Sequence, residues 1–201
     1  IKKEVIDGVV FLNLDQKDSK VNIVSPKLIH VFEHVIDDII SDDEIKAAVF
    51  ISAKKDFIAG ADIQSFSAEK VGDFQPISRK GHLLLDKLQS SPKPFVAAIH
   101  GTAYGLGVEL PLACTARIAS NHSSTKLALP EVKLGILPGG GGTQRLPRLI
   151  GLQASLDMML TGKNIFARKA KKIGLIDELV HPSKLKVAAK KLALSLVNKS
   201  I

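Results

Sequence analysis

The chain has 201 residues, 45% of them hydrophobic and 24% charged, which suits one domain with a sizeable core. No apolar run approaches the roughly 20 residues of a transmembrane helix, and the single cysteine, Cys114, excludes an internal disulfide. The net charge of +8 is uneven, because residues 101–201 hold 15 Lys/Arg and only 5 Asp/Glu.

A basic half suits a polyanionic partner, such as the phosphates of a cofactor, a nucleic acid or an anionic membrane surface, but a solvated basic surface is the simpler interpretation. Aromatic residues make up only 4% of the chain, which argues against a single-stranded nucleic-acid platform built on stacking. The sequence has no signal peptide and no initial Met, so we expect a piece of a longer protein, and the lone cysteine fits a reducing compartment.

In the first half, Asp7-Gly8 separates two β-rich pieces within 5–14 and predicts a hairpin. Ser25-Pro26 is a helix start, and apolar residues recur at helical spacing to about Ile40. The apolar runs at 47–52 and 95–99 predict buried strands. A short helix is expected over 62–68 and a longer one over about 76–90.

In the second half, short extended pieces and helices alternate. We expect extended pieces at 116–119, 126–129 and 175–180 and helices at about 144–150, 152–161, 166–173 and 184–198, with Ser183 capping the last helix. Between them, a flexible glycine-rich loop runs over 138–143. No linker divides the chain, so residues 1–201 are expected to form one domain.

The stretch His100 to Leu110 joins a predicted buried strand to a predicted helix through small residues. Such residues allow a ligand to approach the backbone closely, and the first N–H groups of the helix would face it. Glu109 supplies a carboxylate beside these donors. The combination suits chemistry on a carbonyl compound, with N–H groups for a developing oxyanion and an acid or base nearby.

Several common motifs are excluded. The glycine run ending at Gly142 is followed by Thr143-Gln144 rather than the Lys of a phosphate-binding loop, and Gly105-x-Gly107 lacks the third glycine of a dinucleotide fingerprint. The six histidines show no metal-binding spacing. We interpret His30 and His34 as surface residues and His100 as a structural residue beside the site.

Glu131 is a second carboxylate in unusual surroundings, since it follows Pro130 between apolar residues. A carboxyl group in such a place can have a raised pKa and exchange protons near neutral pH. Each glutamate taken alone is better interpreted as a cap or a solvated residue, and sequence spacing does not show whether Glu109 and Glu131 converge.

Five blocks in one order resemble the crotonase (enoyl-CoA hydratase/isomerase) family over about residues 5–198. They are Phe57-Ile58-Ala59-Gly60-Ala61-Asp62-Ile63, Ala97-Ala98-Ile99-His100-Gly101, Gly105-x-Gly107-x-Glu109-Leu110, Leu129-Pro130-Glu131-Val132-x-Leu134-Gly135 and Pro138 to Pro147. Within the family, Ile51 to Asp62 and Leu156 to Lys163 are most similar to the N-terminal hydratase domains of multifunctional fatty-acid oxidation proteins. The resemblance implies an α/β fold, a spiral of β-β-α units with C-terminal helices.

The resemblance also implies roles for particular residues. Backbone N–H groups of Ala61 and Leu106 would form an oxyanion hole for the thioester oxygen of an acyl-CoA. Glu109 and Glu131 would flank a water that adds across the double bond of a trans-2-enoyl-CoA, with Glu131 as main proton donor to C2. The coenzyme A site would be lined by backbone of residues in one loop: Ile58, Ala59, Ala61, Asp62, Ile63 and Gln64.

The sequence departs from the family pattern at two places. The family commonly has three glycines before the first glutamate, whereas the middle one is here Leu106, which disfavours a positive φ. Pro111 stands two residues after Glu109, and proline is tolerated only in the first turn of a helix, so we expect that helix to start near 108–110.

The implied function is hydration of enoyl-CoA in fatty-acid β-oxidation, with no cofactor besides the coenzyme A of the substrate. Two alternatives stay open: a Δ3-Δ2-enoyl-CoA isomerase on the same site, and a non-catalytic acyl-CoA-binding or RNA-binding homologue. The partners that the resemblance implies are a 3-hydroxyacyl-CoA dehydrogenase region in the same full-length chain and a thiolase β subunit. Family members form trimers or belong to larger complexes, and both assemblies stay open here. We also expect peripheral membrane association and no specific nucleic acid. The expected compartment is the bacterial cytoplasm or the mitochondrial matrix.

Overall fold

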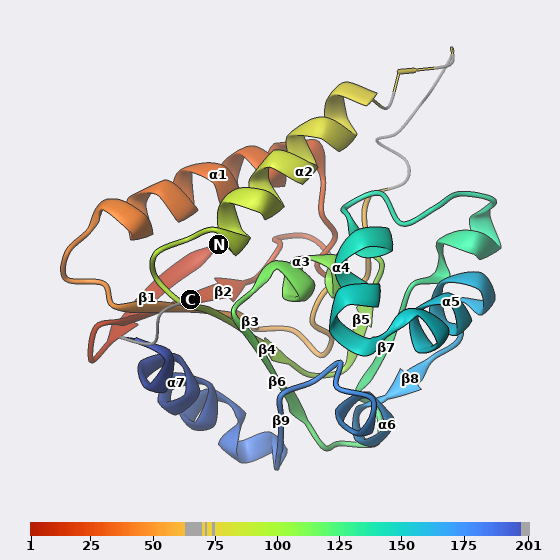
Figure 1. Ribbon diagram of the computed structural model, residues 1–201. Coiled ribbons are helices and arrows are strands. Elements are labelled where there is room, and N and C mark those ends of the chain that lie inside the picture. The colour runs from red at the N-terminus through yellow and green to blue at the C-terminus, as the bar shows by residue number, and fades with distance from the viewer. Residues whose placement is uncertain (63–69, 71, 74, 198–201) are drawn as a thin grey trace.

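A six-stranded sheet lies at the centre of the computed structural model, which describes residues 1–62, 70, 72–73 and 75–197 (Figure 1). The strand order is β1-β2-β3-β4-β6-β9; β1 is antiparallel to β2, and all other neighbours are parallel. The strands are β1 (Lys2–Ile6), β2 (Val9–Leu14), β3 (Ala47–Ser52), β4 (Phe95–Ile99), β6 (Ala116–Ser120) and β9 (Glu178–Val180).

A small second sheet lies beside the large one and has the order β5-β7-β8. Its strands are β5 (Thr102–Tyr104), β7 (Lys126–Ala128) and β8 (Ile165–Phe166). The helices are α1 (Pro26–Ser41), α2 (Gln75–Gln89), α3 (Leu106–Ala113), α4 (Gly142–Ile150), α5 (Leu152–Thr161), α6 (Ala167–Lys172) and α7 (Leu185–Leu196), with 3₁₀ helices η2 (Pro130–Leu134) and η3 (Pro182–Lys184).

The chain follows a spiral in which a strand of the large sheet is followed by a short extended segment and then a helix. The pattern is complete in β4-β5-α3, and β6 and β7 repeat it before η2. In the two earlier turns the extended segments are shorter, and isolated bridges link Val24 to Ala61 and Ile58 to Ala103. The extended segments of successive turns therefore lie side by side, which confirms the expected spiral of β-β-α units.

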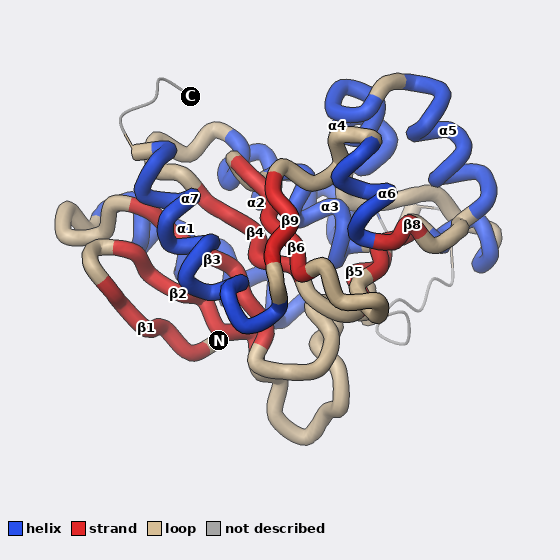
Figure 2. Tube along the Cα trace, turned by 90° about the horizontal axis from the view of Figure 1, so that it is seen from below, coloured by secondary structure: helices blue, strands red, loops and turns tan. Residues whose placement is uncertain are grey.

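The large sheet is buried on both faces. Apolar side chains such as Phe50 and Phe95 pack with α1 and α2 on one face, while Val49 and Ile118 on the other face pack with α7. Figure 1 shows α1 and α2 above the sheet and α7 below it, and Figure 2 shows α7 lying across the strands. Burial on both faces explains why β3 is a continuous apolar run rather than an alternating one.

Most predicted elements are confirmed. Asp7 and Gly8 both have positive φ, at 54° and 76°, as the tight turn of a hairpin requires. The Ser25 hydroxyl accepts a hydrogen bond from the Leu28 N–H and so caps α1. Buried strands at 47–52 and 95–99 are present with the expected bounds, and Cys114 is buried.

Three expectations are wrong in detail. Helix α3 begins at Leu106 and keeps Pro111 in its interior, because it is short and ends with a tight bond from the Cys114 N–H to the Pro111 carbonyl. Ser183 does not cap α7; it lies in η3, where the His181 ring accepts from its N–H. Helix α4 begins at Gly142 rather than 144. The helix expected over 62–68 falls almost wholly outside the described residues.

Candidate active site

The spiral brings three segments together that are distant in the sequence. The Phe57 N–H donates to the Thr102 carbonyl at 3.1 Å and the Tyr104 N–H to the Ile58 carbonyl at 3.0 Å, so the 57–61 segment runs beside β5. At the end of β5, the Gly105 N–H donates to the Ala128 carbonyl at 3.0 Å, just before the segment that carries Glu131. The predicted site residues thus come from three successive turns of the spiral.

Two N–H groups at this junction are available for a ligand. Leu106 is the first residue of α3, and the first N–H groups of a helix have no intrahelical partner. Ala61 lies next to Gly60, which packs against Gly105. Within the described part of the chain, neither the Ala61 N–H nor the Leu106 N–H donates a hydrogen bond. The structure therefore places the two predicted donors near one another.

Leu106 does not strain the backbone. The positive φ at this turn, 54°, belongs to Gly105, and Leu106 adopts the helical conformation that follows. A Cβ on Gly105 would lie 2.9 Å from Oε1 of Glu131, and one on Gly107 would lie 2.4 Å from the Ile58 carbonyl oxygen. Glycine is required at these two flanking positions, but not at Leu106, where the concern raised from the sequence does not hold.

Glu109 is fixed by the glycine-rich loop. Its side chain is 1% exposed, and Oε1 accepts hydrogen bonds of 2.8 Å from the N–H groups of both Gly140 and Gly142. A Cβ on either glycine would lie within 3 Å of a carboxylate oxygen, at 2.8 Å from Oε2 for Gly140 and 2.9 Å from Oε1 for Gly142. The loop predicted to be flexible is thus folded tightly around the carboxylate.

Glu131 is held differently. It lies in the first turn of η2, and its Oε1 points towards Gly105 at the N-terminus of α3. Its Oε2 is buried and has no hydrogen-bond partner among the described residues. A buried carboxylate oxygen without a partner costs free energy unless it is protonated or meets a ligand.

The two carboxyl groups influence each other. Burial raises the pKa of Glu109 to about 7, and the negative charge of Glu131 adds to this rise, while the two loop N–H groups oppose it. Burial also raises the pKa of Glu131. Oε1 of Glu131 lies beside Gly105, and Glu109 lies one turn further along α3, where its N–H donates to the Gly105 carbonyl. The two residues therefore meet at the N-terminus of α3, which the sequence alone left open, and they are suited to exchange protons near neutral pH.

Two positioning residues were not predicted from the sequence. Asn22 is 3% exposed; its side-chain amide donates to the Phe57 carbonyl at 3.0 Å, and its backbone carbonyl accepts from the Ala59 N–H at 2.8 Å, so it holds the segment before Ala61. Arg145 donates to the Gly140 carbonyl at 3.0 Å and to Asp86 at 2.5 Å, which ties the glycine-rich loop to α2. Arg145 lies in the last of the five resembling blocks and Asn22 in none of them, but only their contacts show what the two side chains hold.

Four of the residues predicted to line a coenzyme A site lie in one extended segment: Ile58, Ala59, Ala61 and Asp62. Ile58 is buried and its carbonyl accepts from Tyr104, while the Ala59 N–H is bonded to Asn22. Ala61 and Asp62 continue the segment, and the Asp62 N–H donates to the Val24 carbonyl at 2.9 Å. Ile63 and Gln64 lie outside the described residues, so their predicted roles stay predictions.

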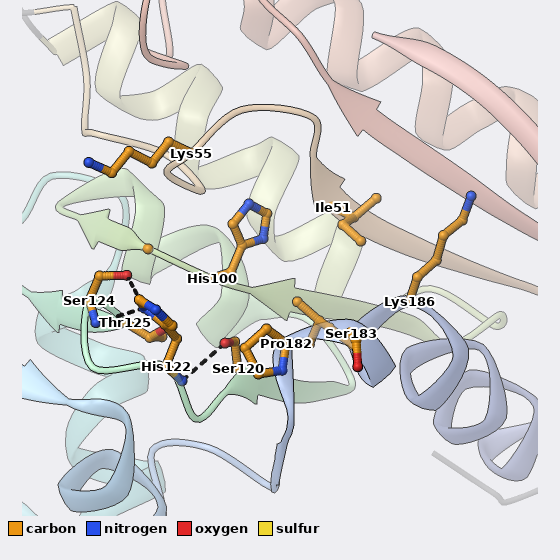
Figure 3. Close-up of a pocket in the computed structure, with 12 residues that line it drawn as sticks. Ile51, Lys55, His100, Ser120, His122, Ser124, Thr125, Pro182, Ser183 and Lys186 are labelled. Carbon is orange, nitrogen blue, oxygen red and sulfur yellow. Dashed lines mark hydrogen bonds between the residues drawn. The ribbon is translucent and has the colours of Figure 1, made fainter.

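A separate pocket of about 380 Å³ lies where β3, β4 and β6 end (Figure 3). It is lined by His100, His122 and Thr125 among others, and by neither Glu109 nor Glu131. The Nε2 atom of His100 lies 2.8 Å from the Lys54 carbonyl oxygen, an interaction that fixes the ring. His100 thus makes a structural contact, as predicted, and it faces this pocket (Figure 3).

The described residues contain no group of three or more His, Cys, Asp or Glu that could hold a metal ion. None of the helices in the described part of the chain is long and apolar enough to cross a membrane. His30 and His34 are exposed on α1, as expected.

Comparison with known proteins decides the family. The model described as "Enoyl-CoA hydratase/isomerase" matches residues 4–201. The chain belongs to the enoyl-CoA hydratase/isomerase family. Solved structures of family members agree: an enoyl-CoA hydratase from Bacillus anthracis shares 30% identity with a TM-score of 0.89, over 98% of this chain and 76% of that one. One from Geobacillus kaustophilus shares 33% identity with a TM-score of 0.90, over 98% and 74%.

Among curated proteins, the fatty acid oxidation complex subunit alpha of Shewanella baltica is 44% identical over 191 residues. The match covers 94% of this chain but only 27% of that relative. A second subunit alpha, from another Shewanella strain, is 46% identical over 87% of this chain and 25% of its own length. The chain therefore spans about a quarter of the length of the curated relatives that it matches.

Proposed function

We propose that the chain catalyses the reversible hydration of trans-2-enoyl-CoA thioesters to 3-hydroxyacyl-CoA. The observation that carries this proposal is the convergence of Glu109 and Glu131, both with raised pKa, beside the free N–H groups of Ala61 and Leu106. Family membership supports the same reaction class.

The N–H groups of Ala61 and Leu106 act as the oxyanion hole. They donate to the thioester oxygen, where negative charge develops as the double bond is attacked. The N-terminal end of α3, with its partial positive charge, faces the same oxygen. The loop from Ile58 to Asp62 holds the coenzyme A thioester against this end of the helix.

The two carboxyl groups have different roles in proton transfer: Glu109 accepts a proton and Glu131 donates one. Oε1 of Glu109 is occupied by two loop N–H groups, so Oε2 is the atom that accepts a proton from the attacking water. The water oxygen bonds to C3, and Glu131 donates a proton from its unpartnered Oε2 to C2. The net result is addition of H and OH across the double bond, with no cofactor.

A second candidate is isomerisation of Δ3-enoyl-CoA to Δ2-enoyl-CoA on the same site. This reaction needs one carboxylate that removes a proton from C2 and returns it to C4. The asymmetry of the pair favours it as an additional activity, since loop N–H groups hold one oxygen of Glu109, whereas the buried Oε2 of Glu131 has no partner among the described residues. Glu109 is then a spectator.

The partners follow from the same resemblance. The subunit-alpha relatives belong by name to a fatty acid oxidation complex. We infer that this chain likewise works beside a 3-hydroxyacyl-CoA dehydrogenase region and a thiolase subunit, which remove the hydroxyacyl product. We also propose that this chain forms a trimer and associates peripherally with a membrane.

The test mixes the protein with crotonyl-CoA and decenoyl-CoA and follows the ultraviolet band of the enoyl thioester. Decay with the parent protein and none with a Glu109→Gln/Glu131→Gln double variant supports hydration at this pair. Circular dichroism of the double variant shows whether it folds. Equal decay with both proteins contradicts the proposal, as does thioester binding without decay by the parent.

A further inference from the structure

The side chain of Leu106 borders the same space as the reactive oxygen of Glu109. A Cβ placed on Gly140 would lie 2.6 Å from Cδ2 of Leu106 and 2.8 Å from Oε2 of Glu109. Both atoms therefore approach one point, on the side of the carboxylate that its loop N–H groups leave open. The isobutyl group occupies part of the space beside the proposed reaction centre.

The backbone does not dictate this side chain. Gly105 and Gly107 are forced by positive φ or by close contacts, whereas Leu106 has ordinary helical geometry and accommodates any side chain that the surrounding space admits. Leu106 is only partly buried and packs against the edge of the core. Removing its side chain should therefore enlarge the site without unfolding the core.

We propose that Leu106 determines acyl specificity by filling the space beside the reacting carbons, so that thioesters unbranched at C3 are accepted and those with a methyl branch at C3 are rejected. The inference rests on the proposed function. If the Leu106 N–H binds the thioester oxygen, its side chain lies next to C2 and C3, which follow directly from the thioester carbon. A second substituent on C3 would then compete with Cδ2 for the space at Gly140.

The expected size of the effect follows from known discrimination by one methyl group. A single methylene in a tight pocket changes kcat/KM by roughly 10-fold to 200-fold. Leu106→Gly should therefore raise kcat/KM for 3-methylcrotonyl-CoA relative to crotonyl-CoA at least about 10-fold. Leu106→Ala should give a smaller rise in the same direction.

The chain supplies a matched control in Leu152. Like Leu106, it is the first residue of a helix and follows a glycine with positive φ, Gly151 at 83°. It is 64% exposed, and η2 lies at the opposite end of α5, where a Cβ on Gly162 would lie 3.1 Å from Cα of Pro130. Leu152→Gly has the same cost of glycine in a first helical turn, and it should leave the ratio of the two substrates unchanged.

The experiment measures kcat and KM of the intact protein and its variants with both enoyl thioesters. Titrations with butyryl-CoA and isovaleryl-CoA, which cannot be hydrated, repeat the comparison as binding affinities. A ratio that rises in Leu106→Gly but not in Leu152→Gly supports the inference. An unchanged ratio in both measurements overturns it.

The two proposals fail in different ways. If the parent protein binds the saturated thioesters, and Leu106→Gly selectively improves isovaleryl-CoA binding, but no enoyl thioester is hydrated, only the proposed function fails. If hydration occurs and the branched-to-straight ratio does not move, only the role of Leu106 fails. If neither thioester binds, both are overturned.

Discussion

Glu109 and Glu131 lie close together, yet their surroundings are opposite. Glu109 sits inside a buried helix and has one oxygen held by two N–H groups of the glycine-rich loop. Glu131 sits on the 3₁₀ helix η2, which ends at the exposed Leu134 and is followed by the exposed Ile136 and Leu137. Its Oε2 has no partner among the described residues.

The difference assigns distinct tasks to two identical side chains. An anchored carboxylate keeps its position and is suited to orient a water, because its rotamer is locked by the loop. A carboxyl group with an unpartnered oxygen is suited to donate a proton to substrate, because no hydrogen bond must break first. Changes at Glu131 should therefore affect chemistry directly, and changes around Glu109 should affect positioning.

The largest effect is expected from Glu131→Gln. The amide keeps the shape of the side chain but cannot exchange a proton, so kcat for hydration should fall about 100-fold or more. Absorbance of the enoyl thioester measures the rate, and KM should change little because the oxyanion donors remain. Activity close to that of the parent would show that Glu131 is not the proton donor.

A smaller loss is expected when the anchor of Glu109 is disturbed. In Gly142→Ala the new Cβ would lie 2.9 Å from Oε1 and 3.2 Å from Cγ of Glu109, so the carboxylate must move. We expect kcat to fall about 10-fold and the protein to lose about 1–3 kcal/mol of unfolding free energy through overpacking.

Gly139→Ala is the control for that change. It lies in the same loop, but a Cβ there would meet nothing within 4 Å. Its kcat and its midpoint of urea unfolding should stay close to those of the parent protein. Equal losses in both variants would mean that the loop tolerates no side chain at either position. The effect of Gly142→Ala would then not come from its contact with the Glu109 carboxylate.

Sequence patterns predicted the strands of the large sheet, but not the different surroundings of Glu109 and Glu131. Continuous apolar runs identified β3 and β4, since strands buried on both faces carry no alternation. The convergence of Glu109 and Glu131 depends on the hydrogen bond from Gly105 to Ala128 between adjacent spiral turns, which local spacing does not encode.

The glycine-rich loop shows the same limit. A run of glycines is compatible with flexibility, with phosphate binding or with close packing, and the residues alone do not distinguish these. The loop packs closely because two of its N–H groups donate hydrogen bonds to the buried carboxylate of Glu109. The family resemblance named Glu109, Glu131, Ala61 and Leu106, but Asn22 and Arg145 required the contacts themselves.

The burial of Glu109 should also appear as a pH dependence of stability. The pKa of its carboxyl group is about 7 in the folded protein against an ordinary 4.5, so between these values the folded state keeps a proton that the unfolded state releases. The stabilisation is complete below the ordinary value and is lost as pH rises through the folded value. The slope contributed is at most about 1.4 kcal/mol per pH unit.

Glu109→Gln should remove this slope, as measured by urea unfolding at several pH values between 5 and 8. Glu178→Gln, an exposed glutamate at the start of β9, should leave it in place. If the slope is the same in the parent protein and both variants, Glu109 is not the group that titrates.

The smallest effect is expected one step further from the carboxylates, at Arg145. Its guanidinium bonds Gly140, Asp86 and Gln89 at once, and so fixes the loop whose N–H groups hold Glu109. Arg145→Lys keeps the positive charge but cannot span these three partners. We expect kcat to fall a few-fold while the pH profile of kcat/KM is unchanged.

Arg145→Gln should in addition shift that profile to higher pH, because the positive charge of Arg145 lowers the pKa of Glu109. Arg148→Lys is the control, since Arg148 bonds only Gln144 of its own helix among the described residues. Equal pH profiles for the Lys and Gln variants of Arg145 would show that its charge does not act on Glu109, and its role would then be confined to holding the loop.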